Sequence, residues 1–276
     1  MPTASSVKSA ARAALKGRWP SAFCIGAILL SVFSVHLVLY ESFLVMFSSV
    51  INITASNILA LIILILAGQF FGMPLIYGSL RWFWFTSDGH NVPISEIFCY
   101  FSSSFEYLRA LSLSFRIFLR IVAILVLCFL PTAIVTVIRQ PITYQLLHYP
   151  MPDWVPSIWI LNDFLAIFGT IISVILLMRY FTAPILMINC PDLAPQEVLH
   201  LSVIISKNAN GKTINFLLSF ILWAVLTLLV IPALYTVPFF LCAYAVYCRH
   251  IISNYNNIIA HDNNAFSPQY PNYIQK

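Results

Sequence analysis

Charged residues are scarce in this sequence and make up 8% of its 276 residues. A soluble domain carries about a quarter of its residues as Asp, Glu, Lys and Arg. The chain is instead 61% hydrophobic, with a mean hydropathy of +0.90. These values exclude a soluble core wrapped in a charged surface, and a hydrocarbon layer is the solvent that suits such a chain.

Sequence motifs for catalysis or metal binding are also missing. Eight glycines leave little room for a phosphate-binding loop, and HExxH, GxSxG and histidine pairs at helical spacing do not occur. The six cysteines are scattered without a CxxC pair, so we expect neither a zinc site nor a disulfide framework. We therefore predict a protein that is not an enzyme and needs no metal, no cofactor and no nucleic acid partner.

What the chain has in abundance is long apolar stretches. About 20 residues of helix cross a hydrocarbon layer of roughly 30 Å, and Pro232 and Pro238 are expected to separate the last two stretches. We predict an all-α, polytopic membrane helix bundle in one domain, residues 1–252, followed by a polar, disordered cytoplasmic tail, residues 253–276. The predicted spans are residues 22–40, 58–80, 117–138, 164–188, 214–231 and 234–252.

The Lys and Arg residues are distributed unequally between the two sides of these spans. With the amino terminus inside, 13 of the 14 cations fall on the inner side and only Arg139 falls on the outer side. Cations in short loops stay cytoplasmic, so we predict a multi-pass protein of the cell (plasma) membrane with both termini in the cytoplasm. The alternative is a mitochondrial location, because no acidic residue precedes Glu41.

The segment ahead of the first span has the pattern of a basic amphipathic helix. Val7, Ala11 and Leu15 share one face, while Lys8, Arg12 and Lys16 share the opposite one. Such a helix is expected to lie in the membrane interface with its apolar face in the lipid. It would serve either as a topology anchor or, alternatively, as a site for anionic headgroups.

Two similar elements follow Pro93 and Pro195. The first has an apolar stripe that includes Ile97, Phe98 and Phe101, and each element precedes a span that runs outward. Together with the amino-terminal helix they suggest three repeats of an amphipathic helix and a helical hairpin, at about residues 5–80, 93–190 and 195–252. The alternative is a chance similarity, since apolar helices resemble one another.

Few polar residues are candidates for a site. Basic residues predicted to contact lipid headgroups are Lys8, Arg12, Lys16, Arg18, Arg109, Arg116 and Arg120, and the last three could share one helical face. That stripe could alternatively admit an anionic ligand. His36 and Asp163 form a possible intramembrane polar site, although a lone His is more often a packing residue and Asp163 lies near a span end.

Motifs at both ends resemble a known family. Its pattern is matched by Ala11-Arg12, Leu15-Lys16-Gly17, Trp19, Ser202, Gly211-Lys212, Phe216, Ser219-Phe220, Trp223, Pro238 and Tyr247, whereas Phe239 replaces the expected Tyr. The chain thus resembles an uncharacterised family, a domain of unknown function, of six-span bacterial integral membrane proteins, mostly Gram-positive. The family is similar in layout to the membrane domain of some glycerophosphodiester phosphodiesterases. The esterase domain itself is not in this sequence, so the resemblance implies no hydrolytic activity.

These observations favour a non-enzymatic membrane protein that binds a lipid or amphiphile, or assists its export, with membrane lipids as partners. One alternative is a secondary transporter, which needs a polar cavity at mid-membrane. Another is an accessory or immunity subunit that acts on a protein partner in the membrane.

Overall fold

The computed structural model describes residues 3–48, 53–146, 155–207, 209–227 and 229–263. These residues form helices and connecting turns and contain no strand, which confirms the all-α fold. Five helices in the described part of the chain are long and apolar enough to cross a membrane: Trp19–Ser42, Asn57–Ser87, Ser104–Val137, Ser157–Asn189 and Ile231–Asn257. The polytopic membrane class therefore holds, while the count of six spans is not confirmed.

The order of elements repeats three times along the chain. The first unit contains α1 (Ala4–Leu15), α2 (Trp19–Ser48), α3 (Ile53–Ala67), the π-helix η1 (Gly68–Gly72) and α4 (Met73–Ser87). The second contains the 3₁₀-helix η2 (Ile94–Phe101), α5 (Ser104–Leu146), α6 (Val155–Leu177), the 3₁₀-helix η3 (Met178–Tyr180) and α7 (Ala183–Asn189). The third contains α8 (Pro195–Lys207), α9 (Asn210–Leu218), α10 (Ile221–Leu226) and α11 (Val230–Asn263). Each unit is a short helix followed by a hairpin.

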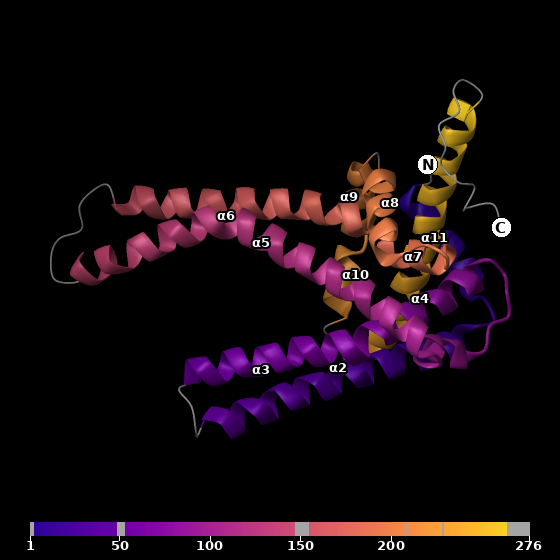
Figure 1. Cartoon of the computed structure of the whole chain (residues 1–276), viewed down its shortest axis with the longest axis horizontal. Helices are drawn as coiled ribbons and strands as arrows, with labels where there is room; N and C mark the ends of the chain where they lie inside the picture. Colours follow the sequence, from indigo (N-terminus) through magenta and orange to yellow (C-terminus); the bar gives the residue numbers. More distant parts are fainter. Residues whose placement is uncertain (1–2, 49–52, 147–154, 208, 228, 264–276) are drawn as a thin grey trace.

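The short helix of each unit packs on the returning helix of another unit. η2 packs on α4, α8 packs on η3 and α7, and α1 packs on α11. The last contact closes a ring of three units. We call the end of the molecule where α1, η2, α4, α7, α8 and α11 meet the platform (Figure 1).

Two hairpins, α2–α3 and α5–α6, extend from the platform to the same side and diverge from each other (Figure 1). Their apolar side chains remain exposed, for example Phe33 at 61%, Leu127 at 70% and Phe168 at 64%. The large buried side chains, such as Tyr77, Trp82 and Phe239, lie in the platform instead. The protein core is therefore at one end, and lipid is the natural solvent for the hairpins.

The returning helices of the first two units change geometry at η1 and η3, and each break is followed by a proline in the next first turn, Pro74 or Pro184. Proline has no N–H group, so the carbonyl four residues earlier loses its helical donor. For Pro74 that carbonyl belongs to Phe70, and the Tyr107 hydroxyl of α5 donates to it at 3.0 Å. The freed carbonyl thus joins the first unit to the second.

The third hairpin differs from the prediction. The expected span 214–231 is not one helix, because α9 ends at Leu218 and α10 covers only Ile221–Leu226. The expected break at Pro232 and Pro238 is also wrong, since α11 begins at Val230 and continues through both residues. Pro232 lies in the first turn of α11, where its missing N–H needs no partner.

The carboxyl-terminal boundary also differs. Residues 253–276 were expected to be a disordered tail, but α11 remains helical to Asn263. The later residues lie outside the described part of the chain. A helix that continues from the apolar layer into water becomes polar in composition, so its last turns resemble a disordered tail in the sequence.

The role of α1 needs a further correction. Val7, Ala11 and Leu15 are fully buried, and α1 packs against α11 and α4. The prediction that this apolar face enters the lipid is therefore wrong. An amphipathic pattern records that one face is buried but not whether lipid or protein covers it.

Candidate functional site

The predicted headgroup-binding cations have different environments, and Arg109 is the most buried at 7% exposure. Its Nη2 donates to the carbonyl oxygens of Cys190 at 2.8 Å and Leu193 at 3.1 Å, just beyond the end of α7. Its Nη1 lies 3.8 Å from the Glu106 carboxylate. Protein carbonyls thus occupy the guanidinium of Arg109, and its headgroup contact stays a prediction.

Arg18 of the first unit also donates to carbonyl groups at the end of a returning helix, as Arg109 does in the second unit. Its two terminal nitrogens donate to the carbonyls of Thr86 and Gly89 at 3.0 and 2.9 Å, at the end of α4. Carbonyl groups at a helix carboxyl terminus lack intrahelical donors and carry partial negative charge, so a cation there is stabilising. Arg18 and Arg109 therefore each hold a returning helix against the start of its own hairpin.

Lys8 is also bound to protein. Its Nζ donates to the carbonyl of Ser219, which follows the last residue of α9, and lies 4.4 Å from the centroid of the Phe220 ring. Burial, and to a lesser degree the charge of Arg12, lowers the pKa of Lys8. Lys8 thus connects α1 to the third unit.

Four of the predicted cations remain accessible. Lys16, Arg12 and Arg116 are exposed, and Arg120 is half-buried. The Arg12 guanidinium lies 5.5 Å from the Phe239 ring centroid and that of Arg120 lies 5.3 Å from Tyr180. Within the described residues none of these four forms an ion pair with an acid. Two belong to the α1 region and two to α5, so they form two groups.

The possible intramembrane site is not assembled. His36 lies on α2, where its Nδ1 is 2.7 Å from the Val32 carbonyl of the same helix. Asp163 is an exposed residue of α6. The two residues belong to different hairpins (Figure 1), so they do not form a common polar site.

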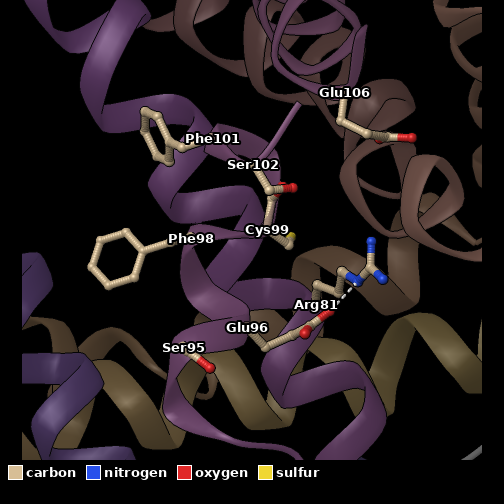
Figure 2. Close-up of a pocket in the computed structure, with 8 residues that line it drawn as sticks. All are labelled: Arg81, Ser95, Glu96, Phe98, Cys99, Phe101, Ser102 and Glu106. Atoms are coloured by element: carbon tan, nitrogen blue, oxygen red, sulfur yellow. Dashed lines mark hydrogen bonds and ion pairs between the residues drawn. The ribbon is translucent and has the colours of Figure 1, made fainter. Parts of the chain in front are cut away.

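A pocket of about 740 Å³ at the platform was not predicted. Figure 2 shows the Arg81–Glu96 pair at one side, Glu106 at the other, Cys99 and Ser102 between them, and the Phe98 and Phe101 rings directed to the opposite flank of η2. The Arg81 Nε lies 2.8 Å from the Glu96 Oε1. The lining residues are Arg81, Ser95, Glu96, Phe98, Cys99, Phe101, Ser102 and Glu106.

Local geometry explains how η2 presents these side chains. Residues three apart eclipse one another in a 3₁₀-helix, so Ser95, Phe98 and Phe101 form one ridge and Glu96, Cys99 and Ser102 form the next. Ile97 and Tyr100 are buried at 0% and 2% exposure. The sequence pattern treated Ile97, Phe98 and Phe101 as one apolar face, because it assumed the period of an α-helix.

A glycine allows η2 to approach α4 closely. A Cβ atom on Gly78 would lie 1.9 Å from the carbonyl oxygen of Ile97. The backbones of the two elements are therefore in direct contact at this point. The close approach brings Arg81, one turn further along α4, next to Glu96.

The charges in the pocket permit binding rather than nucleophilic chemistry. Burial, partly opposed by Arg81, raises the pKa of the Cys99 thiol to about 11, so the thiol is protonated at neutral pH. No group of three or more His, Cys, Asp or Glu residues in the described chain could hold a metal ion. One guanidinium and two carboxylates in a half-exposed pocket can hold an ionic ligand by charge-assisted hydrogen bonds.

Comparison with known proteins identifies a family but no activity. A family model described as "Protein of unknown function (DUF975)" matches residues 1–255, which include all three short helices and most of α11. No curated protein and no solved structure shows significant similarity to the chain.

Proposed function

The chain belongs to the DUF975 family, and we propose that it is a plasma-membrane protein that binds phospholipid through its platform, with both termini in the cytoplasm. Lipid binding would either be its task or assist the export of a lipid or amphiphile. The single observation that carries this proposal is the set of accessible cations at the platform and on the neighbouring part of α5, Arg12, Lys16, Arg116 and Arg120, which have no acidic partner among the described residues.

Their position supports contact with anionic headgroups. Helix α5 has 43 residues and is about 65 Å long, roughly twice the hydrocarbon thickness. Arg116 and Arg120 lie in its platform-proximal part, next to the exposed Leu119 and Val122. A cation near an anionic leaflet contributes about 1 kcal/mol, so these residues would retain acidic phospholipids.

The test is native mass spectrometry of the full chain, exchanged into detergent with equal amounts of phosphatidylglycerol and phosphatidylcholine. The double variant Lys16→Gln/Arg116→Gln is expected to retain about 25-fold less phosphatidylglycerol, since two contributions of about 1 kcal/mol each add to about 2 kcal/mol. Arg139→Gln is the matched control, because it removes a cation near the far end of the α5–α6 hairpin. Equal losses in both variants, or no loss, would exclude the proposal.

A second candidate function, an accessory subunit with a protein partner, is favoured by the separated hairpins. Polar groups occur on their exposed surfaces: Asp163 is exposed on α6, and the neighbouring Asn162 lies 3.5 Å from the Thr136 hydroxyl. Polar side chains in a span often contact another helix. A stoichiometric second polypeptide in the mass spectrum would support this function. A secondary transporter stays an alternative, which would need a polar cavity between the spans in addition to the pocket at the platform.

A further inference from the structure

The pocket beside η2 differs in charge from the cationic sites of the platform. We propose that it binds a zwitterionic headgroup in which a phosphate is linked to an ammonium group, as in phosphatidylethanolamine. This inference extends the proposed lipid binding to a second headgroup class and uses other residues.

The first argument is the charge balance of the pocket. Arg81 and Glu96 neutralise each other at 2.8 Å. Glu106 faces the same space in Figure 2, with its side chain 33% exposed. Its nearest cation, Arg109, already donates to the carbonyls that follow α7. The pocket thus contains a paired cation and a carboxylate with unused acceptor capacity, which favours a ligand that carries a positive group.

The second argument concerns the Arg81–Glu96 pair. A ligand with one charge could bind one member only by leaving the other partly buried and uncompensated, which is costly. A phosphate–ammonium zwitterion avoids this cost, because its phosphate can bind Arg81 while its ammonium binds Glu96 and Glu106. The exchange replaces the Arg81–Glu96 pair with a phosphate–Arg81 pair and an ammonium group shared by two carboxylates, so no charge is left alone.

The third argument is the shape of the surface. The volume of about 740 Å³ is within the ordinary range for small-molecule sites, about 300–1,000 Å³. Ser102 and Ser95 add hydroxyl groups, and Phe98 and Phe101 on the opposite flank are 48% and 41% exposed. A headgroup on the charged ridge would therefore have its acyl chains next to exposed aromatic rings, as expected of an element at a membrane interface.

The test uses the full chain in detergent with equal amounts of phosphatidylethanolamine and phosphatidylglycerol, analysed by native mass spectrometry. Wild-type protein is expected to retain phosphatidylethanolamine, and Glu106→Gln to retain about tenfold less of it, as expected from the loss of one charge-assisted contact. The matched control is Asp192→Asn, which removes an exposed acid of the platform outside the pocket and should leave retention unchanged.

A second variant separates loss of binding from misfolding. Glu96→Gln leaves Arg81 without its partner, so the pocket should change its preference and retain phosphatidylglycerol over phosphatidylethanolamine. A misfolded protein would lose both lipids. The proposal is overturned if Glu106→Gln behaves like Asp192→Asn, or if Glu96→Gln does not alter the ratio of the two lipids.

A competition experiment identifies the source of the headgroup. If soluble phosphoethanolamine displaces the lipid, the site recognises the zwitterion itself, free or in a lipid. If it does not displace the lipid while Glu106→Gln does reduce retention, the lipid is the ligand and the acyl chains contribute to binding. The Lys16→Gln/Arg116→Gln variant should keep its phosphatidylethanolamine, so this inference and the proposed function can fail separately.

Discussion

Arg109 and Arg116 lie seven residues apart on one helix, yet they have different tasks. One is buried with carbonyl partners and the other is exposed, where its Nε lies 3.3 Å from the Ser112 hydroxyl of its own helix. The sequence could not separate them, because the carbonyls that bind Arg109 belong to residues about 80 positions later. Function at the residue scale therefore depends on contacts that only the tertiary fold creates.

Replacement of Arg109 should reveal this difference. Arg109→Leu leaves the carbonyls of Cys190 and Leu193 without their donor and removes the cation that lies 3.8 Å from the Glu106 carboxylate, so we expect the free energy of unfolding to fall by about 3 kcal/mol. Arg116→Leu should change it by less than about 0.5 kcal/mol. Thermal unfolding in detergent, followed by circular dichroism, measures both. Equal destabilisation of the two variants would contradict the capping role.

The raised pKa of the Cys99 thiol should slow its alkylation and make the stability of the fold depend on pH. Its folded pKa of about 11, against an ordinary value of 9.0, leaves about a hundredfold less thiolate at pH 8 than an ordinary thiol has. Alkylation by iodoacetamide, measured by peptide mass mapping, should be slower by about that factor. Because the fold favours the protonated form, the stability contributed by this group is present below pH 9 and is lost as the pH rises towards about 11. Rapid alkylation at pH 8 would show that the thiol is open to solvent.

Among the secondary-structure elements, α1 and η2 have similar amphipathic sequence patterns but differ in how much of their apolar face is buried. Helix α1 buries its apolar face in protein, whereas η2 buries Ile97 against α4 and exposes Phe98. The sequence predicted the presence and place of both elements. It could not predict what covers each face, because hydrophobic periodicity carries no information about the partner.

The contact between η2 and α4 can be tested through two glycines. Gly78→Ala would place a Cβ atom 1.9 Å from a backbone oxygen of Ile97, so the two elements must separate. We expect a loss of at least about 2 kcal/mol and weaker retention of phosphatidylethanolamine, since the pocket depends on this contact. Gly72→Ala meets no atom within 4 Å and should be neutral or slightly stabilising. Thermal unfolding and lipid retention of the two variants form the comparison, and a harmless Gly78→Ala would disprove the close packing.

For the whole molecule, the sequence predicted most of the architecture. The predicted spans 22–40, 58–80, 117–138, 164–188 and 234–252 lie within helical segments, and the three-unit order agrees with the ring of contacts. The pocket was not predicted, since Arg81, Glu96 and Glu106 belong to three different elements, of which α4 and η2 approach each other closely at Gly78. The third hairpin escaped because apolar composition alone cannot show that a helix is interrupted at Ser219 and Phe220.

The same hairpin leads to a prediction about topology. Helices α9 and α10 have nine and six residues, about 23 Å together, which is less than the roughly 30 Å of hydrocarbon. We therefore expect alkaline phosphatase fused after Leu226 to be inactive, whereas fusion after Ser48 should give an active enzyme on the outer side. A fluorescent protein fused after Lys276 should fold in the cytoplasm, because a hairpin returns the chain to its starting side whether or not it crosses fully. Phosphatase activity of the fusion after Leu226 would show that this segment crosses the membrane and that the protein has six spans. If alkaline phosphatase replaced the fluorescent protein after Lys276 and were active, the cationic platform would lie on the outer surface, which contradicts the positive-inside rule.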